Sequence, residues 1–239
     1  MVDPVMLKIP AHVAAMLAEY IAYTPPNPPP KKEETTKYNG GDLISYIAAA
    51  ASRLALAFAW SIHGFEIAAL LARDARTPAA SAVLAFLFKR PSDVRRLSLD
   101  KTFLLGLSSL IFGAALRKTC YITLGRHFTF QLALLKEHRL VTAGPYSYVR
   151  HPSYTGMVAS VGGMLVAQLA PGGWIRESGV LETKRGKAVV GTWTLWLTWL
   201  IVAMLRRVPK EDEVLRREFG AQWEEWASRV RYALVPYVY

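Results

Sequence analysis

Hydrophobic residues in this chain occur in long blocks separated by polar connections. Two blocks, Tyr154–Ala170 and Ala188–Leu205, contain no charged residue. Each is close to the length of roughly 17 to 25 residues with which an apolar helix crosses a bilayer. Two further blocks, Leu43–Ala72 and Thr102–Leu124, are interrupted by only a few charges. Because soluble domains rarely contain two long uncharged stretches, the pattern favours membrane spans over buried soluble helices.

Three other segments are less regular. Met1–Tyr23 holds only three charged residues and fits either a first span or an interfacial helix. Pro78–Phe88 is apolar but about half the required length, so we expect a re-entrant piece or part of a hairpin. Thr24–Lys37 is rich in proline and then charged, which predicts an extended, exposed linker.

These patterns predict an all-α fold, a transmembrane helical bundle of about five spans. We expect residues 1–239 to form a single integral membrane domain. Residues 1–125 would hold the N-terminal spans and residues 126–239 the functional core. The orientation stays open, because a cytosolic C-terminus places the basic segment Arg73–Lys101 against the positive-inside tendency unless Pro78–Phe88 forms a hairpin.

Composition narrows the function classes. The chain has 239 residues, of which 52% are hydrophobic, and this excludes a disordered protein. Its single cysteine, Cys120, has no partner for a disulfide, and the five histidines show no metal-ligand spacing, so we expect no metal site. The 29 Lys and Arg residues are spread evenly, 15 in residues 1–130 and 14 in 131–239. We therefore interpret the net charge of +11 as anchoring to anionic lipid headgroups, and we expect no nucleic-acid partner.

Candidate chemistry lies in the second half of the chain. Gly144-Pro145 predicts a turn, and Pro152 fits the first turn of the helix that follows. Arg150 and His151 would then lie at the N-terminus of that helix, near the headgroup boundary. From the residues alone, we favour interfacial anchoring over a binding site for Arg150, His151 and the nearby tyrosines.

The last span is followed by an amphipathic pattern. Its apolar positions recur at helical spacing and are Leu215, Phe219, Trp223, Trp226 and Val230. Arg207 and Glu211 are four residues apart, so they can share one helix face. A surface salt bridge would be the simplest reading of that pair.

Charged and polar residues inside the apolar blocks offer a different reading. Arg53, His63 and Glu66 would support a transport function, since ionisable groups inside a membrane often mark ion pathways. We favour polar contacts that face the interior of the bundle, or a position at the end of a span near the membrane surface. A non-enzymatic channel or scaffold would explain the spans but not two polar motifs at one membrane boundary.

The order of these motifs resembles the isoprenylcysteine carboxyl methyltransferase family over about residues 120–236. The matching residues are His138, Leu140, Val141, Thr142, Gly144, Pro145, Tyr146, Arg150, His151, Pro152, Tyr154, Gly156, Arg207, Glu211, Asp212, Leu215, Phe219 and Gly220. The resemblance implies an integral membrane enzyme, in the endoplasmic reticulum of eukaryotes, that uses S-adenosyl-L-methionine. Its partner would be the prenylated C-terminal cysteine of CaaX-type proteins or a small prenylcysteine, within membrane lipids.

The resemblance also implies residue roles. Arg207 would orient the substrate carboxylate, and the amphipathic C-terminal helix would cover a cytosolic-side donor site. The implied donor-binding residues are Gln131, His138, Arg139, Leu140, Val141, Tyr146, His151, Pro152, Ser153, Tyr154 and Glu211. Asp212 departs from the family pattern, where many members have a second Glu. The chain has no G-x-G-x-x-G motif, in agreement with a donor site unlike the Rossmann type.

The chemistry suits an acidic acceptor. An α-carboxylate has a pKa of about 3.3–3.7, so it is ionised at neutral pH and needs no general base. A guanidinium such as that of Arg207 can hold it through two hydrogen bonds. Methylation of a phospholipid or another lipid amine is the alternative, although Arg207 would repel an ammonium acceptor. A sterol reductase that uses a nicotinamide cofactor is a smaller alternative.

Overall fold

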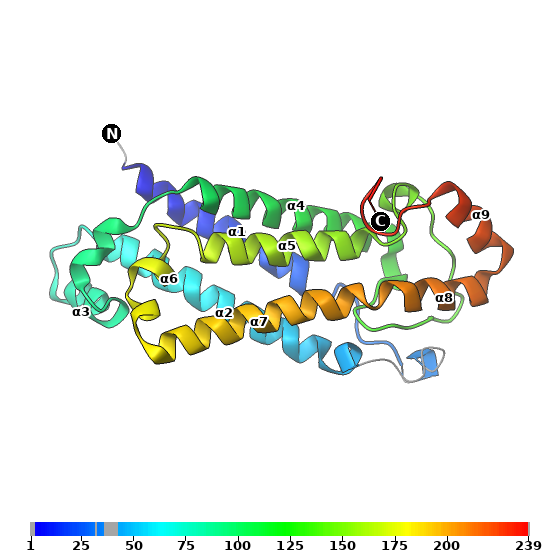
Figure 1. Ribbon diagram of the computed structural model, residues 1–239, viewed down its shortest axis with the longest axis horizontal. Helices are drawn as coiled ribbons and strands as arrows, with labels where there is room; N and C mark the ends of the chain where they lie inside the picture. The colour runs from blue at the N-terminus through cyan, green and yellow to red at the C-terminus, as the bar shows by residue number, and fades with distance from the viewer. Residues whose placement is uncertain (1–2, 32, 36–42, 239) are drawn as a thin grey trace. The chain divides into compact units, whose positions relative to one another are not determined.

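The computed structural model describes residues 3–31, 33–35 and 43–238, and every regular element within them is a helix (Figure 1). The all-α prediction is confirmed. The α-helices are α1 (Lys8–Tyr23), α2 (Leu43–Ala72), α3 (Pro78–Leu87), α4 (Lys101–Leu124), α5 (Pro152–Gln168), α6 (Trp174–Glu177), α7 (Lys184–Leu205), α8 (Val208–Phe219) and α9 (Ala221–Arg229). Short 3₁₀ helices are Pro4–Leu7, Pro91–Arg96, Gly125–His127, Gly144–Ser147 and Val180–Glu182.

Four helical stretches in the described part of the chain are long and apolar enough to cross a membrane. They are Pro4–Tyr23, Ala49–Ala72, Lys101–His127 and Lys184–Phe219. The other expected span forms α5, which has 17 residues and lies at the short end of the crossing range of about 17–25. The expectation of about five spans agrees roughly with this count, and the crossing by α5 itself stays a prediction. With ten residues, α3 is too short to span.

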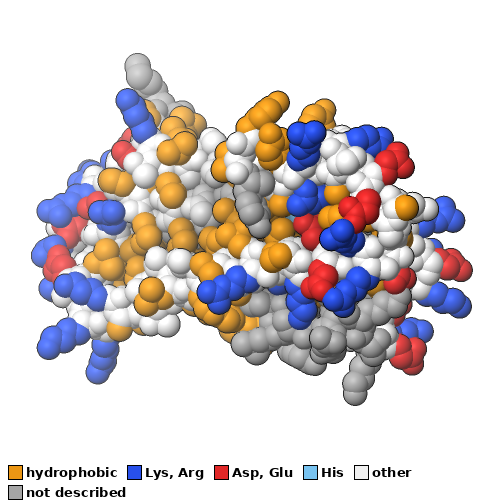
Figure 2. Space-filling view, turned by 45° about the vertical axis from the view of Figure 1, so that its right-hand side comes forward, with side chains coloured by type: hydrophobic (Ala, Val, Ile, Leu, Met, Phe, Trp, Pro, Cys, Tyr) orange, Lys and Arg blue, Asp and Glu red, His pale blue; other side chains and the backbone are white. Residues whose placement is uncertain are grey.

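Large hydrophobic side chains are exposed on these helices. Figure 2 shows them in orange over much of the visible face. The exposed fraction is 64% for Leu54, 68% for Leu105 and 72% for both Ile122 and Leu195. Surfaces of this kind are costly in water but are suited to lipid tails. Together with the four apolar helices, they identify a membrane protein.

The chain divides into two compact units. The first contains Met1–Tyr20, Ala55–Phe112 and Ala159–Thr198, and the second contains Ile21–Leu54, Gly113–Val158 and Trp199–Tyr239. All predicted site residues belong to the second unit. The prediction of one domain with halves at 1–125 and 126–239 stays a prediction.

Glycines let α4 and α5 approach closely. In the first unit, a Cβ added to Gly163 would lie 2.4 Å from Leu110 N and 2.6 Å from Gly106 O. In the second unit, a Cβ on Gly156 would lie 2.9 Å from Gly113 O. Small residues at a helix crossing allow this backbone packing, which is common between membrane helices. α4 and α5 accordingly lie side by side (Figure 1).

The expected turns and helix start are confirmed. Gly144 has a positive φ of 60° and opens the 3₁₀ helix Gly144–Ser147. α5 begins at Pro152, directly after Arg150 and His151.

Of the linker Thr24–Lys37, residues 32, 36 and 37 lie outside the described residues. Its Asn27 side chain donates to the carbonyls of Gly125 (2.8 Å) and Phe128 (2.9 Å), which holds the proline-rich part against the end of α4.

The amphipathic C-terminal pattern packs as expected, but as two helices. Its apolar residues join one core cluster of the second unit: Leu215, Phe219, Trp223, Trp226 and Val230, with Cys120, Tyr121, Phe128 and Tyr146. Gly220 separates α8 from α9 with φ 50° and ψ −120°. Residues other than glycine rarely adopt this backbone conformation. Because it is not helical, the helix predicted as continuous is interrupted at Gly220.

Candidate active site

Three segments of the second unit meet at the start of α5. The Arg150 side chain pairs with Asp212 of α8 at 3.0 Å, from Nη2 to Oδ2. Its Nη1 donates to the carbonyls of Val230 (3.1 Å) and Arg231 (2.6 Å), which follow α9. The backbone N–H of His151 donates to Ala233 O at 2.7 Å. Arg150 therefore joins the start of α5, the start of α8 and the C-terminal segment.

His151 and Tyr154 lie against Glu211 and Asp212, two of the acidic residues of α8. His151 Nε2 is 2.9 Å from Asp212 Oδ1, and its Nδ1 is 3.8 Å from Glu211 Oε2. The Tyr154 hydroxyl donates to Glu211 Oε2 at 2.8 Å. The His151 side chain is only 4% exposed, whereas that of Glu211 is 28% exposed. Glu211 is thus a positioned carboxylate that still reaches solvent.

Arg207 occupies the N-cap of α8, one helical turn before Glu211. Its carbonyl accepts the Glu211 N–H at 2.9 Å. The residue is 3% exposed, and its Nη1 donates to Phe130 O at 3.1 Å. The N-terminus of a helix carries partial positive charge. The buried Arg207 guanidinium adds a full positive charge at that position, one turn before the acidic residues of α8.

Tyr146 belongs to the buried core cluster of the second unit. It is 8% exposed, and its carbonyl accepts the indole N–H of Trp226 at 3.1 Å. Burial raises the pKa of the Tyr146 hydroxyl well above its usual value, and the neighbouring Cys120 thiol and Glu211 carboxylate raise that pKa further. The hydroxyl is therefore neutral at physiological pH. Leu140 packs against the same cluster.

His138 is held in an apolar environment. Its ring lies 4.7 Å from that of His127 and 5.9 Å from that of Phe219. Burial, with a smaller contribution from the neighbouring His127, lowers the pKa of His138 to about 4, so the ring is neutral at pH 7. Within the described residues, His138 Nδ1 and Trp223 Nε1 are buried polar atoms without a hydrogen-bond partner.

The remaining predicted donor residues are more scattered. Pro152 is fully buried in the first turn of α5, beside half-buried Ser153. Gln131 is half-buried, and its backbone carbonyl accepts the Thr129 hydroxyl at 2.6 Å. Arg139 is exposed and Val141 is half-buried. Their roles toward a methyl donor stay predictions.

Sequence reasoning missed the part played by Arg117. This residue of α4 is 4% exposed and donates from Nε to Ala22 O at 2.8 Å. Its Nη1 donates to the carbonyl and hydroxyl of Ser153, both at 3.2 Å. Arg117 thereby fixes the first turn of α5. A basic residue within an apolar block was the available signal, since such residues are costly in a membrane unless they are partnered.

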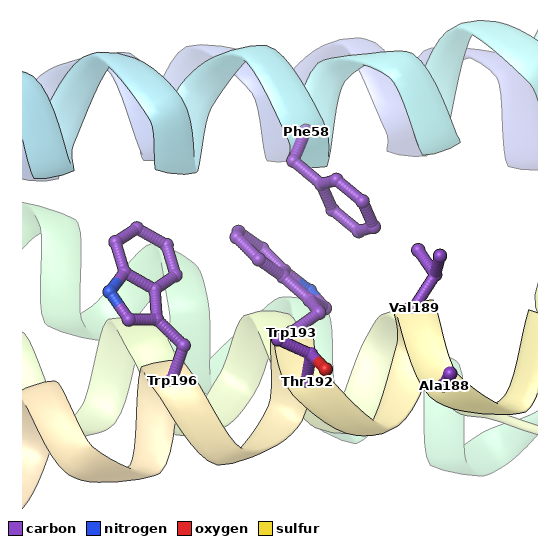
Figure 3. A pocket seen from close by; sticks show the side chains of 6 residues that line it. All are labelled: Phe58, Ala188, Val189, Thr192, Trp193 and Trp196. Carbon is purple, nitrogen blue, oxygen red and sulfur yellow. The ribbon is translucent and has the colours of Figure 1, made fainter.

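A separate apolar pocket of about 400 Å³ lies in the first unit (Figure 3). Phe58 of α2 points toward Trp193 of α7, with ring centroids 4.3 Å apart. The other lining residues are Ala188, Val189, Thr192 and Trp196. None of the predicted site residues lines this pocket.

Comparison with known proteins finds similarity to one family. A model of the "Isoprenylcysteine carboxyl methyltransferase (ICMT) family" matches residues 104–171, which include Arg150–Tyr154. The resemblance to this family is confirmed. The match ends before α8, so the roles of Arg207 and Glu211 are argued from their geometry.

Several relatives bear the corresponding name. "Protein-S-isoprenylcysteine O-methyltransferase B" of Arabidopsis thaliana is 36% identical over 135 residues, 56% of this chain and 58% of the relative. A "probable" enzyme of that name from Oryza sativa subsp. indica is 32% identical over 131 residues, 54% of this chain and 59% of the relative. The Xenopus laevis protein is 44% identical over 54 residues, 22% of this chain and 19% of the relative. The chain thus matches less than two thirds of the length of these relatives. No solved structure matches it.

Proposed function

We propose that this protein transfers a methyl group from S-adenosyl-L-methionine to the C-terminal carboxylate of a prenylated cysteine. One observation carries the proposal: Arg207 and Glu211 present a cation and a partly exposed carboxylate one turn apart on α8. These charges complement the two charged reactants, the carboxylate of the acceptor and the ammonium of the donor.

The residues of the second unit fit the donor. The Glu211 carboxylate, held by the Tyr154 hydroxyl, suits an ammonium group. The buried Nδ1 of His138 and Nε1 of Trp223 provide hydrogen-bonding atoms for the polar adenosine portion. When bound, S-adenosyl-L-methionine supplies a methyl group on a positively charged sulfur. We assign further donor contacts to Gln131, Arg139, Leu140, Val141, Tyr146, His151, Pro152 and Ser153.

Arg207 is assigned to the acceptor. An ionised carboxylate already carries the electron pair that forms the new C–O bond, so the protein does not need a general base. The carboxylate loses its charge as the ester forms, so a cation that bound it ever more tightly would oppose the reaction. We therefore propose that Arg207 orients the carboxylate. Correct orientation of two reactants can by itself accelerate a reaction strongly. Its place at the positive end of α8 supports this role.

The membrane setting fits the apolar part of the substrate. An isoprenoid chain can stay in the lipid phase next to the exposed hydrophobic surfaces of the helices, while its carboxylate reaches the polar site. We propose that the site faces the cytosol and, in a eukaryote, that the protein resides in the endoplasmic reticulum membrane.

The activity is tested with the full chain in membranes or detergent micelles. Labelled S-adenosyl-L-methionine is incubated with N-acetyl-S-farnesyl-cysteine, and base-labile methyl ester is measured. We expect ester on this acceptor and none on N-acetyl-cysteine or on the preformed methyl ester. Methylated phosphatidylethanolamine without any base-labile ester would overturn the proposal in favour of lipid amine methylation.

The roles of the two residues are separated with matched controls. Glu211→Gln is expected to weaken donor binding by about 10- to 100-fold, since a charge-assisted hydrogen bond contributes roughly 1.5–3 kcal/mol. Arg207→Ala is expected to raise the KM for the acceptor and leave donor affinity nearly unchanged. The controls, Glu213→Gln and Arg206→Ala, alter exposed neighbours on the same segment. Equal effects of the Glu211 and Arg207 variants on both reactants would contradict these roles.

A further inference from the structure

Two rows of side chains on α7 line the apolar pocket of the first unit. The lining residues of α7 recur at four-residue spacing, so they form two neighbouring ridges on one face of the helix. One row consists of Ala188, Thr192 and Trp196, and the other of Val189 and Trp193. Phe58 of α2 points toward these rows (Figure 3). The pocket therefore extends along the axis of α7.

Each of the two rows begins with a cation. Lys184 precedes Ala188 by four residues, and Arg185 precedes Val189 by four residues. Residues four apart lie on the same side of a helix, so both cations belong to the face of α7 that lines the pocket. Both are exposed, and α7 begins at Lys184. Because helical side chains lean toward the N-terminus of their helix, these cations extend away from the pocket and toward the headgroup region.

The cations at the beginning of α7 have no acidic partner in the protein. Lys187 is a third exposed cation of the same turn, and none of the three forms an ion pair within residues 3–31, 33–35 and 43–238. The nearest carboxylate along the chain, that of Glu182, is already paired with two other cations, at 2.8 and 2.5 Å. Uncompensated positive charge therefore lies at the charged end of the pocket face.

The buried carboxylates of the first unit have partners of their own. Lys8 Nζ lies 2.5 Å from Glu66 Oε1, and His63 Nε2 lies 3.0 Å from Glu19 Oε1. The expectation that His63 and Glu66 make polar contacts inside the bundle is confirmed. Since these groups are buried, they are not available to the surface cations of α7.

The wall of the pocket suits a chain without polar groups. The Trp193 ring lies 4.3 Å from the Phe58 ring and 5.4 Å from the Trp196 ring, measured between centroids. Its one polar atom, Nε1, donates to Gln168 Oε1 at 3.2 Å inside the protein. Trp193 therefore presents its carbon atoms to the pocket.

The depth of the pocket matches one leaflet of a bilayer. From Ala188 to Trp196 the helix advances eight residues, or about 12 Å at a rise of about 1.5 Å per residue. One leaflet contributes about half of a hydrocarbon core of about 30 Å. A hydrocarbon chain that starts at the cations of α7 would thus follow the pocket through most of its leaflet.

We propose that this pocket binds an acyl chain of an anionic phospholipid, whose phosphate pairs with Lys184 and Arg185. The unpaired cations select an acidic headgroup, and the aromatic wall holds the chain. The proposal does not depend on methyl transfer, and none of its residues belongs to the proposed donor and acceptor site.

The test measures lipid retention by the full chain in detergent with native mass spectrometry. The probes are 1-palmitoyl-2-oleoyl-phosphatidylglycerol and the phosphatidylcholine with the same chains. We expect the anionic lipid to bind at least about tenfold more tightly, since each basic residue near a headgroup strengthens binding about fivefold. Lys184→Gln and Arg185→Gln should each remove about fivefold and leave phosphatidylcholine unchanged.

The matched control for these variants is Lys101→Gln. Lys101 is likewise an exposed cation that begins a helix of the same unit, α4, but α4 does not line the pocket. This variant should retain the anionic lipid as the wild type does. Equal affinity for the two lipids would overturn the proposal, as would an equal loss in the Lys101 variant.

Filling the pocket tests the position of the chain. Ala188→Phe adds a ring at an exposed position of the lining and should lower retention of phosphatidylglycerol at least about tenfold. The control, Ala115→Phe, makes the same change at an exposed position of α4 outside the pocket and should have no effect. Unchanged retention in the Ala188 variant would refute the site. Displacement of the lipid by N-acetyl-S-farnesyl-cysteine, with a raised KM for that acceptor in the Ala188 variant, would assign the pocket to the substrate instead.

Discussion

Removal of the Asp212 carboxylate by Asp212→Asn tests the contacts that hold the site together. The carboxylate accepts from Arg150 Nη2 at 3.0 Å and lies 2.9 Å from His151 Nε2. The side chain of Asp212 is 17% exposed, that of Arg150 15% and that of His151 4%. Charge-assisted hydrogen bonds contribute about 1.5–3 kcal/mol each, and breaking a fully buried ion pair costs about 3–5 kcal/mol. With partial exposure, we expect the free energy of unfolding to fall by about 2–4 kcal/mol.

The assay is equilibrium unfolding of the full chain in detergent micelles, followed by far-UV circular dichroism. Asp212→Glu keeps the charge and should retain most of the stability. The control, Glu213→Gln, removes an exposed carboxylate that pairs with Arg217 on the same helix, and we expect a loss of at most about 0.5 kcal/mol. The reasoning is refuted if Asp212→Asn unfolds within about 0.5 kcal/mol of wild type, or if Glu213→Gln loses as much.

Three further predictions concern backbone packing and pH. Gly163→Ala places a Cβ 2.4 Å from a backbone nitrogen of α4 and should destabilise strongly, whereas Gly162→Ala meets no atom within 4 Å and should be tolerated, as measured by unfolding. Gly220→Ala forces alanine into φ 50°, ψ −120° and should cost about 1–3 kcal/mol, whereas Gly191→Ala inside α7 should cost nothing in the same assay. His138 has a folded-state pKa of about 4, below its unfolded value of about 6.5, so the unfolded chain binds the proton first. The free energy of unfolding should therefore decrease as the pH falls from about 6.5 to about 4. His138→Gln should remove that part of the pH dependence, as measured by unfolding curves at both pH values.

The helices were predictable because lipid leaves a long apolar segment few alternatives. Every backbone polar group must be satisfied inside the segment, and a helix does this alone. The uncharged block Tyr154–Ala170 accordingly lies in α5 and the loop after it, and Pro152 marks the start of the helix. Local turn chemistry was equally readable at Gly144-Pro145.

The hydrogen-bond partners of the buried polar side chains were not predictable, since these bonds join residues far apart in the chain. Arg117 finds the carbonyl of Ala22, 95 residues away, and the first turn of α5. Hydrophobic spacing across residues 215–230 identified the packed face correctly. It contains no information on backbone dihedral angles, so the interruption at Gly220 had only the glycine itself as a signal.

Glu211 and Asp212 of α8 have separate tasks, and helix geometry explains why. Successive residues of an α-helix point about 100° apart, so Glu211 and Asp212 face different surroundings. Asp212 is committed to Arg150 and His151, which fixes the start of α5 and the C-terminal segment. Glu211 receives the Tyr154 hydroxyl and stays 28% exposed, so it can still meet a cationic ligand. We infer that the shorter side chain of Asp212 does not weaken donor binding directly, because that position supports the site rather than contacting the donor.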